Sequence, residues 1–147
     1  MKPYSFRLDK ILDYRGYLRK KAQIDLFNAR NECLEREKEV MRLVTKKNEL
    51  SIKCSEEEIM GISVPVYNTY QTYLKNIDND LEKAYIKLDS GKDEVVAKEM
   101  ILKQTSINKK MLEVLKELKY KKYMQALGRE EQKTLDELVI TGKRQNA

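Results

Sequence analysis

Apolar and small residues recur along most of this chain at alternating steps of three and four, which strongly restricts its fold. This spacing places the residues on one face of a helix, and its persistence over many heptads is typical of a coiled coil. The first row is Leu26, Ala29, Cys33, Arg36, Val40, Leu43, Lys47, Leu50 and Cys54. The second row is Tyr67, Tyr70, Leu74, Ile77, Leu81, Ala84, Leu88, Gly91, Val95, Lys98 and Leu102. Two long helices are therefore predicted.

The outer ends of both rows are less regular. Ile11, Leu18 and Ala22 extend the first row toward the N-terminus, but the step from Ala22 to Leu26 is four where three is due, which indicates a stutter. Beyond Leu102 the register is ambiguous. A stripe restarts there and consists of Met111, Leu115, Leu118, Leu127, Leu135 and Leu138.

A single stretch combines Gly and Pro, namely Gly61 to Pro65. Gly is a common residue just after a helix, and Pro disfavours the helical conformation of the residue before it. We therefore predict helices over about residues 6–58 and 67–140, joined by a connection over about 59–66, in one coiled-coil domain spanning 1–147. The fold class is all-α, a long antiparallel two-helix coiled coil whose second helix is longer and overhangs the first.

The composition argues against an enzyme. The chain has no His, which removes the commonest general base and metal ligand. Its two Cys cannot form a four-Cys zinc site, and no Gly-rich phosphate-binding loop occurs. Charged residues make up 37% of the chain, which suits long solvated helices with one buried seam. We expect no catalytic activity, no metal ligands and no cofactor.

The sequence predicts a cytoplasmic protein. No apolar run approaches the ~18–20 residues that a transmembrane helix needs, and the N-terminus leads into charged sequence rather than an apolar signal core. Cys33 and Cys54 lie on one predicted helix, about 32 Å apart at about 1.5 Å per residue, so they cannot form a disulfide within the chain. Their expected role is that of small apolar seam residues in a reducing compartment.

The net charge of +6 is unevenly placed, because residues 1–30 carry eight Lys or Arg and three Asp. Such a basic segment fits nucleic acid, anionic lipid, an acidic protein partner or simply a solvated face. No basic groove interleaved with aromatic residues is visible, and we expect no nucleic-acid partner. The alternative function is nevertheless a basic coiled coil that binds nucleic acid or an anionic membrane surface. The oligomeric state stays open, since the seams can pair within one chain or between two.

The two ends of the chain carry the most specific patterning. The opening has Phe6, Arg7, Leu8, Ile11, Leu12, Tyr14 and Arg15. The closing segment has Arg129, Glu130, Glu131, Gln132, Lys133, Leu135, Asp136 and Glu137. Together, in a two-helix chain of this length, these patterns resemble the FliJ family, the coiled-coil stalk proteins of the bacterial flagellar type III export apparatus.

The resemblance implies an antiparallel coiled coil similar to the gamma subunit of F-type ATP synthases. The implied partners are the hexameric flagellar export ATPase, the cytoplasmic domain of the export-gate membrane protein and export chaperones, whose recycling the stalk assists. The implied location is cytoplasmic, in peripheral association with the inner membrane at the flagellar base. No catalytic activity is implied.

The resemblance also suggests residues that bind the export gate. They are Leu43 and Leu50 in the first helix and Tyr70, Gln71, Tyr73 and Ile77 in the second. Leu43, Leu50, Tyr70 and Ile77 also lie on the apolar rows, where packing between the helices accounts for them. Tyr73 lies off the row and is the better interface candidate, because an exposed Tyr offers a large contact area with a polar tip.

A second set of residues is suggested for the ATPase ring. Arg7, Arg15 and Arg19 would face an acidic ring lumen. Near the C-terminus the candidates are Gln132, Lys133, Asp136 and Glu137. For both groups the alternative is a solvated helix face.

Overall fold

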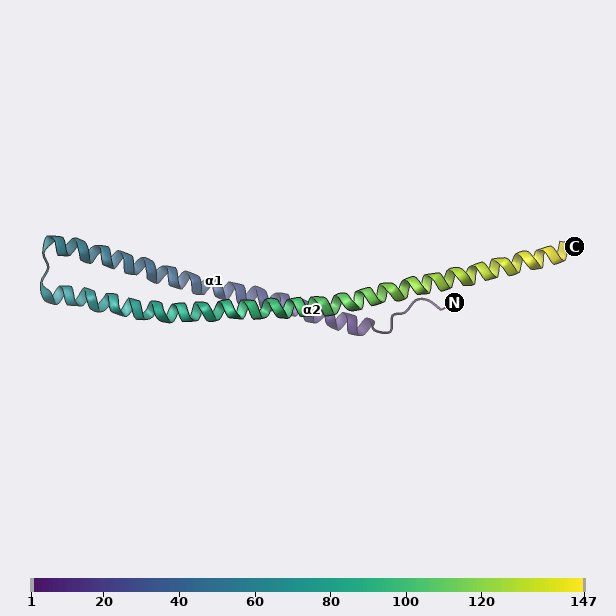
Figure 1. Ribbon diagram of the computed structural model, residues 1–147, viewed down its shortest axis with the longest axis horizontal. Coiled ribbons are helices and arrows are strands. Elements are labelled where there is room, and N and C mark those ends of the chain that lie inside the picture. Colours follow the sequence, from purple (N-terminus) through teal and green to yellow (C-terminus); the bar gives the residue numbers. More distant parts are fainter. Residues whose placement is uncertain (1, 147) are drawn as a thin grey trace. The chain divides into compact units, whose positions relative to one another are not determined.

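The computed structural model describes residues 2–146, and these form two long helices (Figure 1). Helix α1 runs over Asp9–Met60 with 52 residues, and α2 runs over Val64–Asn146 with 83 residues. The described residues contain no strand. The predictions of an all-α helical hairpin and of a longer second helix are confirmed.

Contacts within the chain divide it into two compact units. The terminal unit contains the residues up to Lys20 and those from Lys103 onward, whereas the loop unit contains Lys21–Leu102. The prediction of one coiled-coil domain stays a prediction. No helix among residues 2–146 combines the length and the apolar character that a membrane span requires.

The connection between the helices is shorter than predicted and covers residues 61–63. Gly61 has a φ of 90° and ends α1, which agrees with the predicted stop because a residue without Cβ adopts this conformation at little cost. Pro65 lies inside the first turn of α2 rather than in the loop. The absence of an N–H on Pro65 costs no helical hydrogen bond there, because the first N–H groups of any helix lack intrahelical acceptors.

The core of the loop unit lies along the predicted seam. Its buried cluster consists of Val40, Leu43, Ile77, Leu81, Ala84 and Leu88. Every residue of the first predicted row is buried or half-buried, and so is every residue of the second row from Tyr70 onward, whereas Tyr67 is exposed. Arg30 contacts Glu99, and Lys47, nearer the loop, contacts Asp78 at 2.6 Å, so the helices run antiparallel.

Arg36, a member of the first row, reaches across this seam to α2. Its Nη1 donates a hydrogen bond to the carbonyl of Lys87 at 2.7 Å. Its Nη2 donates to the carboxylate of Glu32, in the preceding turn of α1, also at 2.7 Å. Gly91 faces the guanidinium stem, and a Cβ on Gly91 would lie 3.2 Å from Arg36 Cδ. The missing side chain at Gly91 therefore makes room for Arg36.

Substitution of Gly91 by Ala should reveal this close approach. Ala favours a helix interior by about 1 kcal/mol over Gly, but the new methyl group forces Arg36 to move. We expect Gly91→Ala to raise the free energy of unfolding by about 1 kcal/mol in an Arg36→Ala background and by clearly less in the wild-type background. Urea denaturation of the wild type, the two single variants and the double variant measures this coupling. An equal gain in the free energy of unfolding in both backgrounds would contradict it.

In the terminal unit, the residues before α1 pack along α2 (Figure 1). Phe6 is 4% exposed. The Tyr4 hydroxyl donates to the Lys116 carbonyl at 2.9 Å, and its ring lies 5.1 Å from the Tyr120 ring. The Tyr123 hydroxyl in turn donates to the Lys2 carbonyl at 2.7 Å. The N-terminal segment is therefore ordered but not helical, although a helix was predicted from about residue 6.

The register of α1 in the terminal unit differs from the prediction. Leu8, Leu12, Arg15, Arg19 and Ala22 are buried or half-buried at regular steps of four and three, so the seam needs no stutter. Leu18 is half-buried beside this row. Ile11, which was expected on the seam, is 47% exposed.

The predicted stripe beyond Leu102 is also corrected. The second row continues unbroken through half-buried Thr105, Lys109, Leu112 and Lys116. Of the first three residues of the predicted stripe, Leu115 is half-buried, whereas Met111 and Leu118 are 66% and 53% exposed. Farther along, Leu127 is half-buried, whereas Leu135 and Leu138 are exposed.

Candidate partner-binding surfaces

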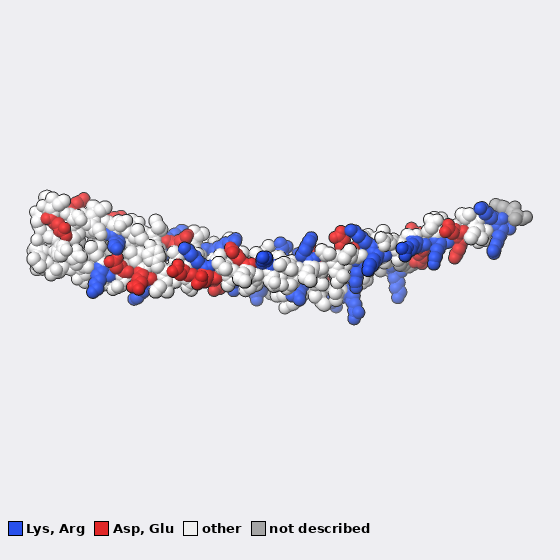
Figure 2. Space-filling model, viewed as in Figure 1, with Lys and Arg blue, Asp and Glu red and all other residues white. Residues whose placement is uncertain are grey.

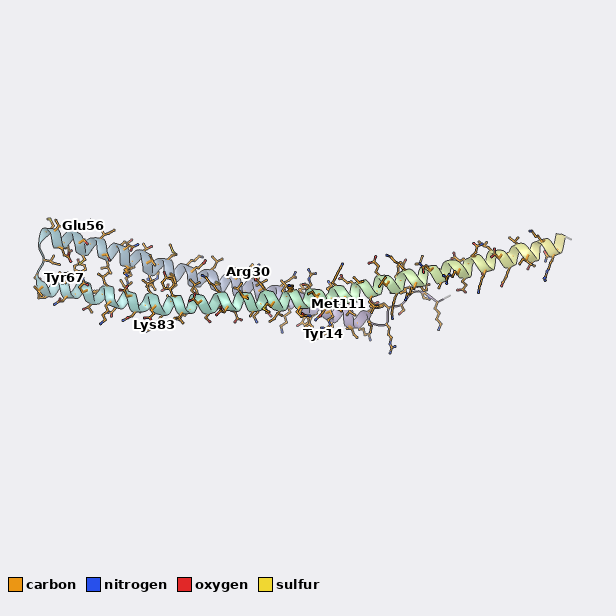
Figure 3. All side chains as sticks on the ribbon, in the orientation of Figure 1. Tyr14, Arg30, Glu56, Tyr67, Lys83 and Met111 are labelled. Atoms are coloured by element: carbon orange, nitrogen blue, oxygen red, sulfur yellow. The ribbon has the colours of Figure 1, made fainter. Side chains whose placement is uncertain are left out.

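A groove of about 600 Å³ lies between the helices near the loop. We call it the loop groove. Residues of α1 form one wall, and the first turns of α2 form the other. Its lining residues are Lys46, Glu49, Leu50, Lys53, Val66, Thr69, Tyr70 and Tyr73. Figure 3 marks this end of the hairpin with Glu56 before the loop and Tyr67 after it.

The loop groove has an apolar floor and a charged rim. Leu50 and Tyr70 are half-buried, whereas Tyr73 is 57% exposed and presents its ring to the solvent. Lys46 and Lys53 stand on the α1 side with Glu49 between them, so the rim is basic overall. A groove with walls from two helices, aromatic side chains and a basic rim suits the apolar face of a partner segment with acidic flanks.

The Tyr70 phenol is held in its neutral form. A hydrogen bond with the Glu57 carboxylate, together with desolvation, raises the pKa of Tyr70 to about 12. The thiol of Cys54 lies 3.6 Å from the Glu58 carboxylate, and burial followed by that contact raises the pKa of Cys54. Both shifts favour the uncharged form of side chains at the loop end of the seam.

The predicted gate residues divide into three groups. Leu43 and Ile77 are 4% and 3% exposed and belong to the core, so they have no free surface to offer a partner. Leu50, Tyr70 and Tyr73 meet in the loop groove. Gln71 is exposed but is not among the residues that line the groove.

The predicted ATPase residues near the N-terminus divide in a similar way. Arg7 is exposed, whereas Arg15 and Arg19 are half-buried on the side of α1 that faces α2. The Nε of Arg19 contacts the Ser106 hydroxyl at 3.3 Å. Arg15 and Arg19 therefore lie in the pairing of the two helices, and Arg7 presents the most accessible charge of the three.

The C-terminal candidates lie on a fully exposed part of α2. All residues over 128–141 are exposed, and Gln132 donates a hydrogen bond to Asp136 one turn later at 3.1 Å. Gln132 lies nine residues, or about 14 Å, beyond the Tyr123 contact with Lys2. The structure therefore does not bring the basic N-terminal residues together with Gln132, Lys133, Asp136 and Glu137.

Comparison with known proteins supports the family resemblance. A family model described as "Flagellar FliJ protein" matches residues 4–146. The chain belongs to the FliJ family. A search of curated proteins found no match. Among solved structures, the fold is similar to that of a putative YscO homolog, CT670, from Chlamydia trachomatis. The TM-score is 0.56 at 15% identity, and the match covers 92% of this chain and 93% of the other.

For this FliJ-family chain, sequence reasoning missed several residues of the candidate surfaces. Val66 and Lys53 line the loop groove, but only the alignment of the two helices reveals them. The tyrosine cluster of Tyr4, Tyr120 and Tyr123 was also missed. The spacing of Tyr120 and Tyr123 was a usable signal, because residues three apart share a helix face. Residues 2–146 contain no group of His, Cys, Asp or Glu that could hold a metal ion.

Proposed function

We propose that this FliJ-family chain is a non-enzymatic stalk and adaptor of flagellar type III export. It acts in the cytoplasm, in peripheral association with the inner membrane at the flagellar base. In this role it binds the hexameric export ATPase, in the manner of a gamma subunit, and the cytoplasmic domain of the export gate. It also assists the recycling of export chaperones. The family match over residues 4–146 supports the assignment to this apparatus.

The division of partners rests on one observation, namely that the two candidate surfaces belong to different compact units. The loop groove, with Leu50, Tyr70 and Tyr73, is the proposed gate surface, and exposed Gln71 stays a candidate beside it. The proposed ATPase surface is the exposed C-terminal part of α2, which carries Gln132, Lys133, Asp136 and Glu137, together with Arg7. Arg15 and Arg19 position the N-terminal part of α1 against α2.

Two variants should separate these partners. Tyr73→Ala removes an exposed aromatic side chain from the loop groove and should weaken gate binding roughly tenfold, because Tyr anchors dominate many interfaces. Removal of residues 129–147 should instead weaken ATPase binding, with little effect on the gate. Binding of the purified ATPase and of the gate domain to each immobilised variant measures both effects.

A matched control and clear contrary outcomes exist. Tyr85, at 48% exposed, lies on α2 outside the loop groove, so Tyr85→Ala should leave gate binding unchanged. Equal loss of both partners in either variant would contradict the division of surfaces. Absence of binding between the wild-type chain and both partners would contradict the export function itself.

A further inference from the structure

The charge of this chain is divided sharply between its two units. The terminal unit carries 17 Lys or Arg and eight Asp or Glu, which gives a net charge of +9. The loop unit carries 13 Lys or Arg and 16 Asp or Glu, which gives a net charge of −3. Figure 2 shows blue side chains projecting along the C-terminal half of α2, whereas the loop end is largely white. The modest overall charge of +6 therefore conceals one strongly basic unit.

An apolar strip lies on the outer face of α2 within this basic unit. It consists of Ile107, Met111, Val114 and Leu118, which are 44%, 66%, 43% and 53% exposed. We call these four residues the α2 strip. Their spacing of four, three and four places them on one helix face, and half-buried Lys109, Leu112 and Lys116 occupy the face toward α1. Figure 3 labels Met111 on this part of α2.

Lysines surround the α2 strip. Lys110 lines the same shallow hollow of about 440 Å³ as the strip. Lys103 lies four residues before Ile107, and Lys121 and Lys122 lie three and four residues after Leu118, so all three share its side of the helix. Two nearby carboxylates pair with lysines, because Glu113 contacts Lys109 at 3.6 Å and Glu117 contacts Lys121 at 3.8 Å. Lys121 therefore shares its charge with Glu117, and Lys103, Lys110 and Lys122 supply most of the positive charge beside the strip.

The form of this surface indicates what kind of partner fits it. Every residue that lines the hollow comes from α2, so no second element forms a wall that would hold a partner helix. In contrast, both helices wall the loop groove. A single helix face with apolar side chains at its centre and lysines at its edges is the arrangement with which amphipathic helices enter the surface of an anionic bilayer.

We propose that the α2 strip and its flanking lysines form a binding site for an anionic membrane surface. The apolar side chains enter the region between head groups and acyl chains, and the lysines bind the lipid phosphates. This site goes beyond the binding of the ATPase and the gate, and it gives the proposed association with the inner membrane a direct lipid contact.

Sedimentation with vesicles tests the proposal on the full chain. The chain should bind vesicles of phosphatidylcholine with about 30% phosphatidylglycerol at about 50 mM salt, and release them at about 500 mM. Vesicles of phosphatidylcholine alone should bind far more weakly. Absence of binding to the anionic vesicles at low salt would overturn the proposal.

Matched variants separate insertion from simple charge attraction. The double variant Met111→Gln with Leu118→Gln should weaken binding to the anionic vesicles roughly tenfold. The double variant Lys110→Gln with Lys122→Gln should weaken it roughly twenty-fold. The control is Met41→Gln with Ile24→Gln, at positions 62% and 52% exposed in the loop unit, and it should change nothing. Circular dichroism should show the same helicity in all variants, since each changed side chain is exposed.

A fluorescent reporter measures insertion directly, because the chain contains no Trp. Met111→Trp should shift its emission to the blue on addition of anionic vesicles, whereas Met41→Trp should not. If duplex DNA binds as tightly as the vesicles and the change at Met111 and Leu118 has no effect on either, the surface is purely electrostatic and the proposal is wrong. ATPase and gate binding are measured on the same variants, so failure of the export function is distinguished from failure of lipid binding.

Discussion

Replacement of Ile77 by Ala should lower the free energy of unfolding of the loop unit by about 3 kcal/mol. Ile77 is 3% exposed and lies in the cluster that joins α1 to α2, so its truncation leaves a cavity that the surrounding side chains fill only in part. The cost therefore exceeds the simple transfer of the lost methyl and methylene groups to water. Urea denaturation of the full chain, followed by circular dichroism, measures this loss.

The same substitution distinguishes a core residue from a partner contact, because Ile77 was also predicted to bind the export gate. Ile86→Ala is the control, since Ile86 lies on the same helix at 64% exposed, and it should cost less than about 0.5 kcal/mol. If Ile77→Ala lost gate binding while its unfolding curve matched that of the wild type, Ile77 would be a partner contact and not a core residue.

The pattern of residues predicted the loop unit well because its seam is apolar almost throughout. Apolar positions such as Leu26, Val40 and Leu81 recur at constant spacing, and the register of each helix follows directly from them. In the first row, Arg36 and Lys47 interrupt the apolar residues but not their spacing, as Lys98 does in the second row. The heads of Arg36 and Lys47 reach the Lys87 carbonyl and Asp78, and their long stems lie along the seam.

In the terminal unit, the apolar spacing of α2 predicted a seam on a face of the helix that does not contact α1. Lys109 and Lys116 occupy seam positions, while Ile107 and Met111 point outward. Lys109 packs against Gly16 of α1, where an added Cβ would make an ordinary van der Waals contact with Lys109 Cε at 3.7 Å. Lys116 pairs with Asp9 at 2.8 Å, a contact that raises the pKa of Lys116. These pairings connect residues about a hundred positions apart, and helical spacing carries no information about them.

The candidate site was predictable only in the part that lies on one helix. Tyr70 and Tyr73 were selected because they follow the loop and because Tyr73 lies off the apolar row. Lys53 and Val66 join them only when the alignment of α1 with α2 is known. The loop of three residues determines that alignment, and the sequence predicted a connection of about eight because Pro65 was assigned to it rather than to the first turn of α2.

Replacement of Phe6 by Ala should release the N-terminal segment from α2. Phe6 is 4% exposed although it precedes the first helix, so burial of its ring holds residues 2–8 in place. Removal of such a ring costs about 3 kcal/mol, which corresponds to a population of the released segment on the order of a hundred times larger. Tryptic cleavage after Arg7 should accelerate by a similar factor, because proteolysis follows the open population when closing is fast.

Two further variants make this result quantitative. Tyr4→Phe removes only the 2.9 Å hydrogen bond to the Lys116 carbonyl. It should weaken the docking of the N-terminal segment by about 1 kcal/mol and accelerate cleavage after Arg7 about fivefold. Tyr14→Ala changes a 58% exposed ring on α1 and should leave cleavage after Arg7 unchanged. If Phe6→Ala and Tyr14→Ala were cleaved at the same rate, the Phe6 ring would not hold the segment. The expected order Phe6, Tyr4, Tyr14 follows from what each substitution removes, namely a buried ring, a single hydrogen bond and an exposed ring.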